Sequence, residues 1–157
     1  MSGKASLNVG KDTERRVVGY LHSRGLTGVE RAVRTGFSAG GRSVADAGDL
    51  TGWPGVCVQV KSLRPANAAE RETRRWLAET EAQRRQSGAS VGLLVVRRWG
   101  TTDVGEWWCF LMARDLLHAA EGGPILHTTT APVRLELEDA VDLLQTWGWA
   151  PAEGIAR

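Results

Sequence analysis

The segment from Asp49 to Lys61 constrains the fold of this chain more than any other part of the sequence. Thr51-Gly52-Trp53-Pro54-Gly55 has the glycine and proline content of a tight turn. The strongly apolar run Val56-Cys57-Val58-Gln59-Val60-Lys61 follows it, so we predict a β-hairpin. Alternation along the second strand places Gln59 and Lys61 on one face, and the turn brings Asp49 back beside Val58 and Gln59.

Size and composition indicate one ordinary globular domain over residues 1–157. The chain has 157 residues, of which 42% are hydrophobic and 24% are charged. Cys57 and Cys109 both lie in apolar runs, which favours small buried side chains over a metal cluster. No apolar run approaches the roughly 20 residues of a membrane span, and residues 1–6 lead into no signal-peptide core. We therefore expect a cytoplasmic protein without a membrane segment.

The rest of the chain alternates between helical and extended patterns. Asn8 as a cap and Gly25 as a stop predict a helix over residues 8–24. The apolar run 91–96 predicts a central strand. The fold class is therefore α/β, with a mixed sheet flanked by helices. The other predicted elements are strands at 29–34, 106–112 and 133–137, the last at an edge, and helices at 68–86, 113–120 and 138–147.

Glu14 lies at the edge of the apolar side of the first predicted helix. Val9, Val17, Val18 and Leu21 form that side, and helical spacing aligns Glu14 with Val17 and Leu21. Two interpretations remain open at this point. The carboxylate either points toward whatever the helix packs on, or it is a solvated first-turn residue stabilised by the helix dipole.

Charge is divided unevenly along the chain. Residues 1–98 carry 17 Lys and Arg against nine Asp and Glu, whereas residues 99–157 carry three against nine. The front part is therefore where a polyanion would dock. Seventeen of the 20 basic residues are Arg, and two explanations stay open with equal weight: selection for forked phosphate contacts, or genome base composition. The charges of helix 68–86 are typical of a solvated, ion-paired face. The loop 36–43 is either a connector or a flap bearing Arg42.

Several short motifs together resemble a known family. They are Gly10-Lys11-Asp12-Thr13-Glu14-Arg15, Gly48-Asp49-Leu50, Pro54-Gly55-Val56, Gln59-Val60-Lys61, Trp76 and Gly105-Glu106-Trp107. This series resembles the small Holliday-junction-resolvase-like nucleases of the PD-(D/E)XK superfamily, in their phage and bacterial forms. The resemblance covers about residues 8–118, with an extension at about 124–149 and a tail at 150–157. It implies a restriction-endonuclease-like core with the order αβββαββ, followed here by an additional strand and helix.

The resemblance also implies a metal-dependent site. Asp49 takes the place of the central metal ligand, Lys61 that of the catalytic lysine, and Gln59 the position usually held by Glu. Glu14 matches a glutamate that such resolvases carry on the first helix, and Val60 offers its backbone carbonyl oxygen. Mg²⁺ or Mn²⁺ is the implied cofactor, because hard cations prefer oxygen ligands. The implied reaction leaves 5′-phosphate and 3′-hydroxyl ends.

The implied partner is branched DNA such as a four-way junction, in recombination or repair. Symmetric cutting needs two active sites, so a homodimer is implied, in a bacterial cell or a phage-infected host. Trp53 is the tryptophan placed to stack on a base. The other expected DNA contacts are Lys11, Arg15, Arg34, Arg42 and Ser43.

Two residues depart from the family pattern. Gly48 stands where Pro is usual, which is a mild change, and the neutral Gln59 removes one negative charge from the metal site. Metal affinity should fall unless Glu14 compensates. Gln59 is compatible with a native variant, a degenerate site in a binding protein, or a substitution made to trap a complex. A nuclease-fold DNA-binding protein without metal chemistry is the alternative function, and a protein-recognition module using the acidic C-terminal part is a third.

Overall fold

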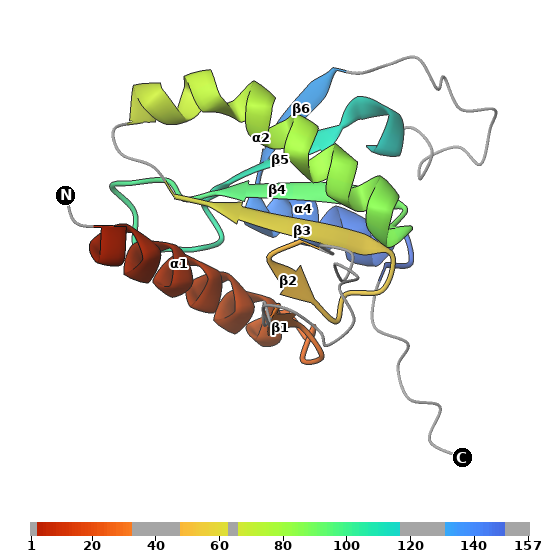
Figure 1. Ribbon diagram of the computed structural model, residues 1–157. Helices are drawn as coiled ribbons and strands as arrows, with labels where there is room; N and C mark the ends of the chain where they lie inside the picture. Colours follow the sequence, from red (N-terminus) through yellow and green to blue (C-terminus); the bar gives the residue numbers. More distant parts are fainter. Residues whose placement is uncertain (1–2, 33–47, 63–65, 117–130, 150–157) are drawn as a thin grey trace, which may run out of the picture.

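A computed structural model describes residues 3–32, 48–62, 66–116 and 131–149 of the chain. These residues form one sheet with helices on both faces (Figure 1). The first half contains α1 (Gly3–Ser23), β1 (Glu30–Arg31), β2 (Leu50–Thr51), β3 (Val56–Lys61) and α2 (Ala66–Ser87). The second half contains β4 (Val91–Val96), β5 (Trp108–Met112), β6 (Pro132–Glu136) and α4 (Leu137–Thr146). Residues 113–116 are also helical.

The sheet is mixed, as the sequence predicts. Its six strands lie in the order β1-β2-β3-β4-β5-β6, so each strand pairs with its neighbours along the chain. β3 and β4 are parallel because α2 crosses over between them, and the other pairings are antiparallel. The predicted element order αβββαββ, with a further strand and helix, is confirmed. The hairpin is confirmed as well, with Leu50 opposite Val58.

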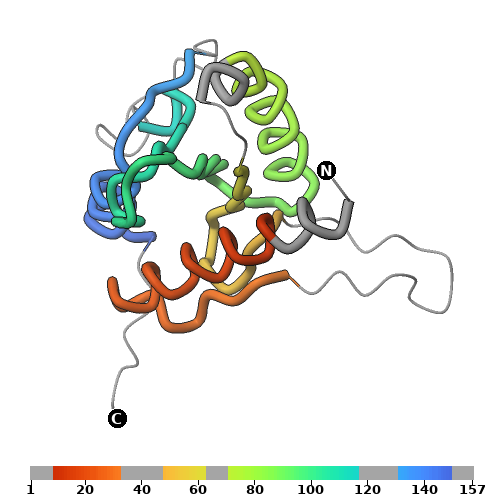
Figure 2. The backbone as a smooth tube through the Cα atoms, turned by 90° about the vertical axis from the view of Figure 1, so that its left-hand side faces the viewer, coloured from red at the N-terminus to blue at the C-terminus, as the bar shows by residue number. Residues whose placement is uncertain are grey.

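The two faces of the sheet are covered by different helices. Val17 and Leu21 of α1 belong to the same buried cluster as Val56, Val58 and Val60 of β3. α4 contributes Leu137, Ala140, Val141 and Leu144 to that cluster, so α1 and α4 share one face. On the opposite face, Trp76 and Leu77 of α2 pack with Leu94 and Val96. Figure 2 shows α1 and α2 on opposite sides of the strands. All six residues of β4 are buried, which confirms the predicted central strand.

The boundaries of several predicted elements are corrected. α1 begins at Gly3 and not at Asn8, so Asn8 lies inside the helix and does not cap it. Val9, expected on the apolar side, is 40% exposed. Glu14 is consequently in the middle of α1, and the interpretation that gave it a first-turn role is wrong. β5 starts at Trp108 and not at residue 106. Parts of the predicted elements at 29–34 and 113–120 lie outside the described residues.

Cys57 and Cys109 are both buried, as their apolar surroundings predict, and they form no disulfide. Burial raises the pKa of the Cys109 thiol far above its ordinary value, so this side chain stays protonated and behaves as a small hydrophobe. Within the described residues, no helix is both long enough and apolar enough to cross a membrane.

Candidate functional site

Asp49 is hydrogen-bonded to β3 on one side and to Ala32 on the other. Its backbone N–H donates to the Val58 carbonyl at 2.9 Å, and its own carbonyl accepts from Ala32 N–H at 2.9 Å. Its side-chain Oδ2 accepts from the backbone N–H of Val60 at 2.9 Å. The carboxylate is therefore fixed beside the Gln59-Val60-Lys61 segment, where the hairpin was predicted to bring it.

Gly48 makes this approach possible. It has a φ of +102°, a backbone angle that residues with a Cβ rarely adopt. A Cβ at this position would also lie 2.6 Å from the Val58 carbonyl oxygen. No proline fits here, because proline is restricted to negative φ. The glycine before Asp49 thus has a local structural reason.

The backbone carbonyl of Val60 lies on the same edge of β3 as the Asp49 carboxylate. The N–H and C=O of one strand residue point toward the same neighbouring strand, and the Val60 N–H points at Asp49. Lys61 points its carbonyl the other way, toward β4, where it accepts from Arg97 N–H at 2.9 Å. One carboxylate and one backbone carbonyl therefore converge at the end of the hairpin, and both oxygen types suit a hard cation.

Gln59 faces α2 and is only 2% exposed. Its Oε1 accepts from the Thr80 hydroxyl at 3.1 Å, and the same hydroxyl lies 2.8 Å from the Trp76 carbonyl. One hydroxyl proton is thus shared between two acceptors. A neutral amide suits this buried position, because a carboxylate there would need a cation or further donors to offset its desolvation.

Lys61 lies at the carboxyl end of β3 with its side chain directed toward α2. Its Nζ is 3.4 Å from Glu79, and the Lys61 side chain is 25% exposed. Arg97 follows β4 at the adjacent strand end, because Lys61 pairs with Val96. The guanidinium of Arg97 stacks 3.8 Å from the Trp99 ring centroid and lies 4.0 Å from Asp12. Two cations therefore flank the carboxyl ends of the parallel strands, where α/β sheets commonly bind ligands.

Glu14 forms an ion pair with Arg31, with 2.7 Å between Oε2 and Nε. Arg31 is opposite Leu50 in the sheet, so the pair lies beside β2, the strand that directly follows Asp49. Glu14 does face the packed side of α1, as one of the two interpretations held. Its carboxylate is engaged with Arg31, however, and a cation at Asp49 would have to share it.

The expected DNA contacts have different outcomes. Lys11 and Arg15 are exposed on α1. Arg34, Arg42 and Ser43 lie outside the described residues. Trp53 is only 4% exposed, and its indole N–H donates to the Trp149 carbonyl at 2.5 Å. The face of this ring is therefore covered, and we withdraw the expectation that Trp53 stacks on a base.

Sequence reasoning missed the partners that hold the predicted site residues. Thr80 occurs on the apolar stripe of α2 that also carries Trp76 and Leu77. A polar residue on such a stripe indicates a buried hydrogen bond, and this signal could have identified Thr80. No comparable sequence pattern indicated that Arg31 and Glu79 would pair with site residues. Among the described residues, no three His, Cys, Asp or Glu side chains gather as a metal cluster. The oxygens that the described residues offer a cation at Asp49 include the Val60 backbone carbonyl, and Mg²⁺ accepts such ligands together with water.

Comparison with protein-family models, curated proteins and solved structures gives no match to this chain.

Proposed function

We propose that this protein is a divalent-metal-dependent DNA endonuclease of the Holliday-junction-resolvase type, acting on branched DNA as a homodimer. The observation that carries the proposal is the position of Asp49. Its carboxylate is fixed on the Val60 N–H, on the edge of β3 that also carries the Val60 carbonyl, while Lys61 is the next residue along β3 and Arg97 follows the adjacent strand β4. Oxygen ligands and cations at one strand end are what metal-assisted phosphodiester hydrolysis requires.

Asp49 and the Val60 carbonyl are the groups that would hold Mg²⁺ or Mn²⁺. A bound cation would polarise the scissile phosphate and lower the pKa of the attacking water. Lys61 is released from Glu79 to meet the negative charge that develops on phosphorus, and Arg97 binds a neighbouring phosphate oxygen. Gln59 supports the strand from the α2 side and adds no charge to the site.

A specific observation favours the alternative function, a DNA-binding protein that has the nuclease fold but no metal chemistry. Each of three predicted site residues already has an internal partner. Gln59 pairs with Thr80, Lys61 with Glu79, and Glu14 with Arg31. In this alternative the same contacts are purely structural, and phosphate binding depends on salt but not on metal.

Cleavage of a labelled four-way junction distinguishes the two functions. With Mg²⁺ or Mn²⁺ we expect the unmodified protein to cut the junction and leave 5′-phosphate ends. Asp49→Asn keeps the side-chain size but weakens the metal site, so cleavage should fall by about a hundredfold or more. Metal-free binding of the junction should change little, because that binding depends on the basic residues.

Gln59→Glu is the matched variant for the amide position. We expect it to cut faster than the unmodified protein if its carboxylate reaches the cation, and to lose stability in the absence of metal because position 59 is buried. An intact junction with both the unmodified protein and Gln59→Glu, together with tight binding, would overturn the nuclease and support the binding protein.

A further inference from the structure

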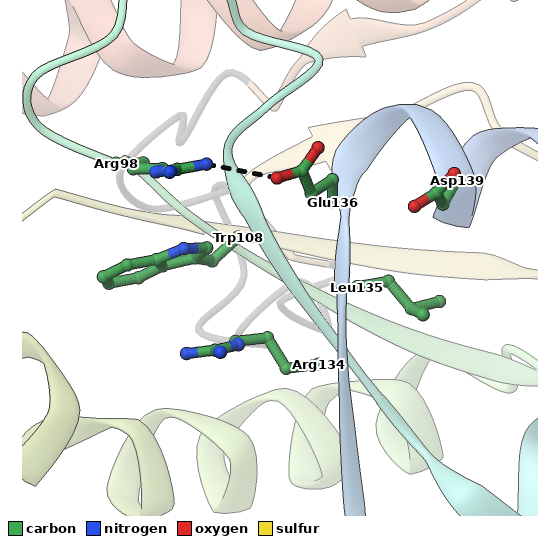
Figure 3. A pocket seen from close by; sticks show the side chains of 6 residues that line it. All are labelled: Arg98, Trp108, Arg134, Leu135, Glu136 and Asp139. Carbon is green, nitrogen blue, oxygen red and sulfur yellow. Dashed lines mark hydrogen bonds and ion pairs between the residues drawn. The ribbon is translucent and has the colours of Figure 1, made fainter.

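A second candidate site lies away from Asp49, toward the β6 edge of the sheet. An open hollow of about 360 Å³ is lined by residues that follow β4 or belong to β5, β6 and α4. Figure 3 shows the ring of Trp108 between the guanidinium groups of Arg98 and Arg134, with two carboxylates nearby. The complete lining is Arg98, Trp108, Arg134, Leu135, Glu136 and Asp139.

Trp108 is an incompletely covered aromatic ring on the sheet. It packs from one side against the buried cluster that contains Trp76 and Val96. α2 lies over β3 and β4, whereas Trp108 belongs to the next strand and is only partly buried. Part of a large planar side chain is therefore available to a ligand, supported from beneath by the core.

The two arginines beside Trp108 differ in whether they already pair with a carboxylate. Arg98 is engaged, because its Nη1 lies 3.1 Å from Glu136. Arg134 is exposed, and its Cζ lies 5.6 Å from the centroid of the Trp108 ring. No carboxylate pairs with Arg134 among the described residues. Arg134 is thus a cation already aligned with the aromatic ring and free to meet a phosphate.

We propose that this hollow binds one unpaired nucleotide of single-stranded DNA. The base stacks on Trp108, Arg134 contacts the attached phosphate, and Glu136 and Asp139 accept hydrogen bonds from an exocyclic amino group. This inference rests on the proposed binding of DNA, and it is independent of whether the protein cleaves it.

The composition of the hollow selects a base together with its phosphate over phosphate alone. Its lining contains two guanidinium groups and two carboxylates, so the net charge offers little attraction to a duplex backbone. A base with an amino group uses the ring, the cation and the carboxylates together. Thymine lacks an exocyclic amino group, so oligo-deoxycytidine should bind more tightly than oligo-deoxythymidine.

Fluorescence anisotropy with short labelled oligo-deoxycytidine, oligo-deoxythymidine and a four-way junction tests this site. Trp108→Ala should weaken oligo-deoxycytidine binding about tenfold, the usual effect of losing one stacking platform. Arg134→Ala changes an exposed side chain and should weaken it several-fold. Arg85→Ala removes the same charge from an exposed position on α2 and should leave binding unchanged.

Asp139→Asn tests the base preference, and we expect it to reduce the advantage of oligo-deoxycytidine over oligo-deoxythymidine. If Trp108→Ala unfolds the protein, Arg134→Ala decides. Equal oligonucleotide binding by Arg134→Ala and Arg85→Ala would overturn the hollow as a nucleotide site, and unchanged junction binding in the same experiment would leave the proposed function intact. Failure of the unmodified protein to bind any of the three DNAs would overturn both.

Discussion

At the scale of single residues, the candidate site depends on Gly48 as much as on Asp49. Two glycines have nearly the same backbone angle, with φ of +102° at Gly48 and +105° at Gly100. A Cβ at Gly48 would meet the Val58 oxygen at 2.6 Å, whereas nothing lies within 4 Å of a Cβ at Gly100. The two positions therefore separate the cost of the backbone angle from the cost of the close contact.

We expect Gly48→Ala to lower the free energy of unfolding by roughly 1–3 kcal/mol more than Gly100→Ala, because only Gly48→Ala forces a side-chain atom into a backbone oxygen. Urea denaturation of both variants measures the difference. The displaced Asp49 should also reduce metal binding in Gly48→Ala alone. Equal losses of stability would contradict the close contact at Gly48.

The residues that could be predicted are those with a local signal. Asp49, Gln59 and Lys61 lie where the hairpin pattern placed them, because turn chemistry and strand alternation are short-range properties. Their partners could not be predicted, since Gln59 meets Thr80 only through the packing of α2 on β3. Burial of Trp53 likewise depends on Trp149, which lies 96 residues further along the chain.

At the scale of elements, a cluster of buried ion pairs links α2 to the segment after β5. Glu81 of α2 is 6% exposed and pairs with both Arg84 and Arg114. Arg114 also pairs with Asp115, at 3.4 Å. Gly92 leaves room for this cluster, because a Cβ there would lie 3.0 Å from the Glu81 carboxylate. Among the described residues, one oxygen of Asp115 is buried without a hydrogen-bond partner.

This cluster predicts a specific pH dependence of stability. Burial raises the pKa of Asp115, against the opposing effect of Arg114. The folded protein therefore binds this proton more tightly than the unfolded chain, and the associated stability is lost as the pH rises from the ordinary carboxyl range through the raised pKa.

Asp115→Asn has no such proton. As the pH rises through this window, the free energy of unfolding of Asp115→Asn should therefore increase relative to that of the unmodified protein. Denaturation across a pH series measures the gain, with the exposed Asp139→Asn as a control for the chemical change. A gain that shrinks with rising pH would show that ionised Asp115 is stabilised in the fold, contrary to our account.

Elements with strong hydrophobic periodicity were predicted correctly, whereas the start of the first helix was placed too late in the chain. β3 and β4 are apolar runs bounded by turns, and both were found. The start of α1 was wrong because Asn8, a good capping residue, continues a helix that already began at Gly3. The pairing of β6 with β5 is non-local, and only its edge position followed from its alternating pattern.

At the scale of the whole molecule, the edge strand β6 bears on how two copies would meet. Ala131 and Leu137 both bond toward β5, so alternation turns the backbone groups of Pro132, Arg134 and Glu136 outward. A proline and two charged residues protect a sheet edge against pairing with another strand. A homodimer by strand addition at β6 is therefore disfavoured, and the dimer of the proposed function would use another surface.

The acidic and basic residues lie on different elements, although α1 and α4 cover the same face of the sheet. Exposed acidic residues of α4 include Glu138, Asp139 and Asp142, whereas Lys11, Arg15, Lys61 and Arg97 lie on α1 or at the carboxyl ends of β3 and β4. A DNA backbone would approach the carboxyl ends of β3 and β4, where Lys61 and Arg97 lie. That approach brings phosphates to Asp49 and its neighbours, as the proposed function requires.

Calorimetric titration with Mn²⁺ tests the central claim most directly, because it needs no knowledge of the preferred DNA. We predict that the unmodified protein binds Mn²⁺ through Asp49, that Asp49→Asn weakens binding at least about tenfold, and that the exposed Asp142→Asn on α4 leaves it unchanged. Equal Mn²⁺ affinity in all three proteins, or no binding by the unmodified protein, would contradict a metal site at Asp49.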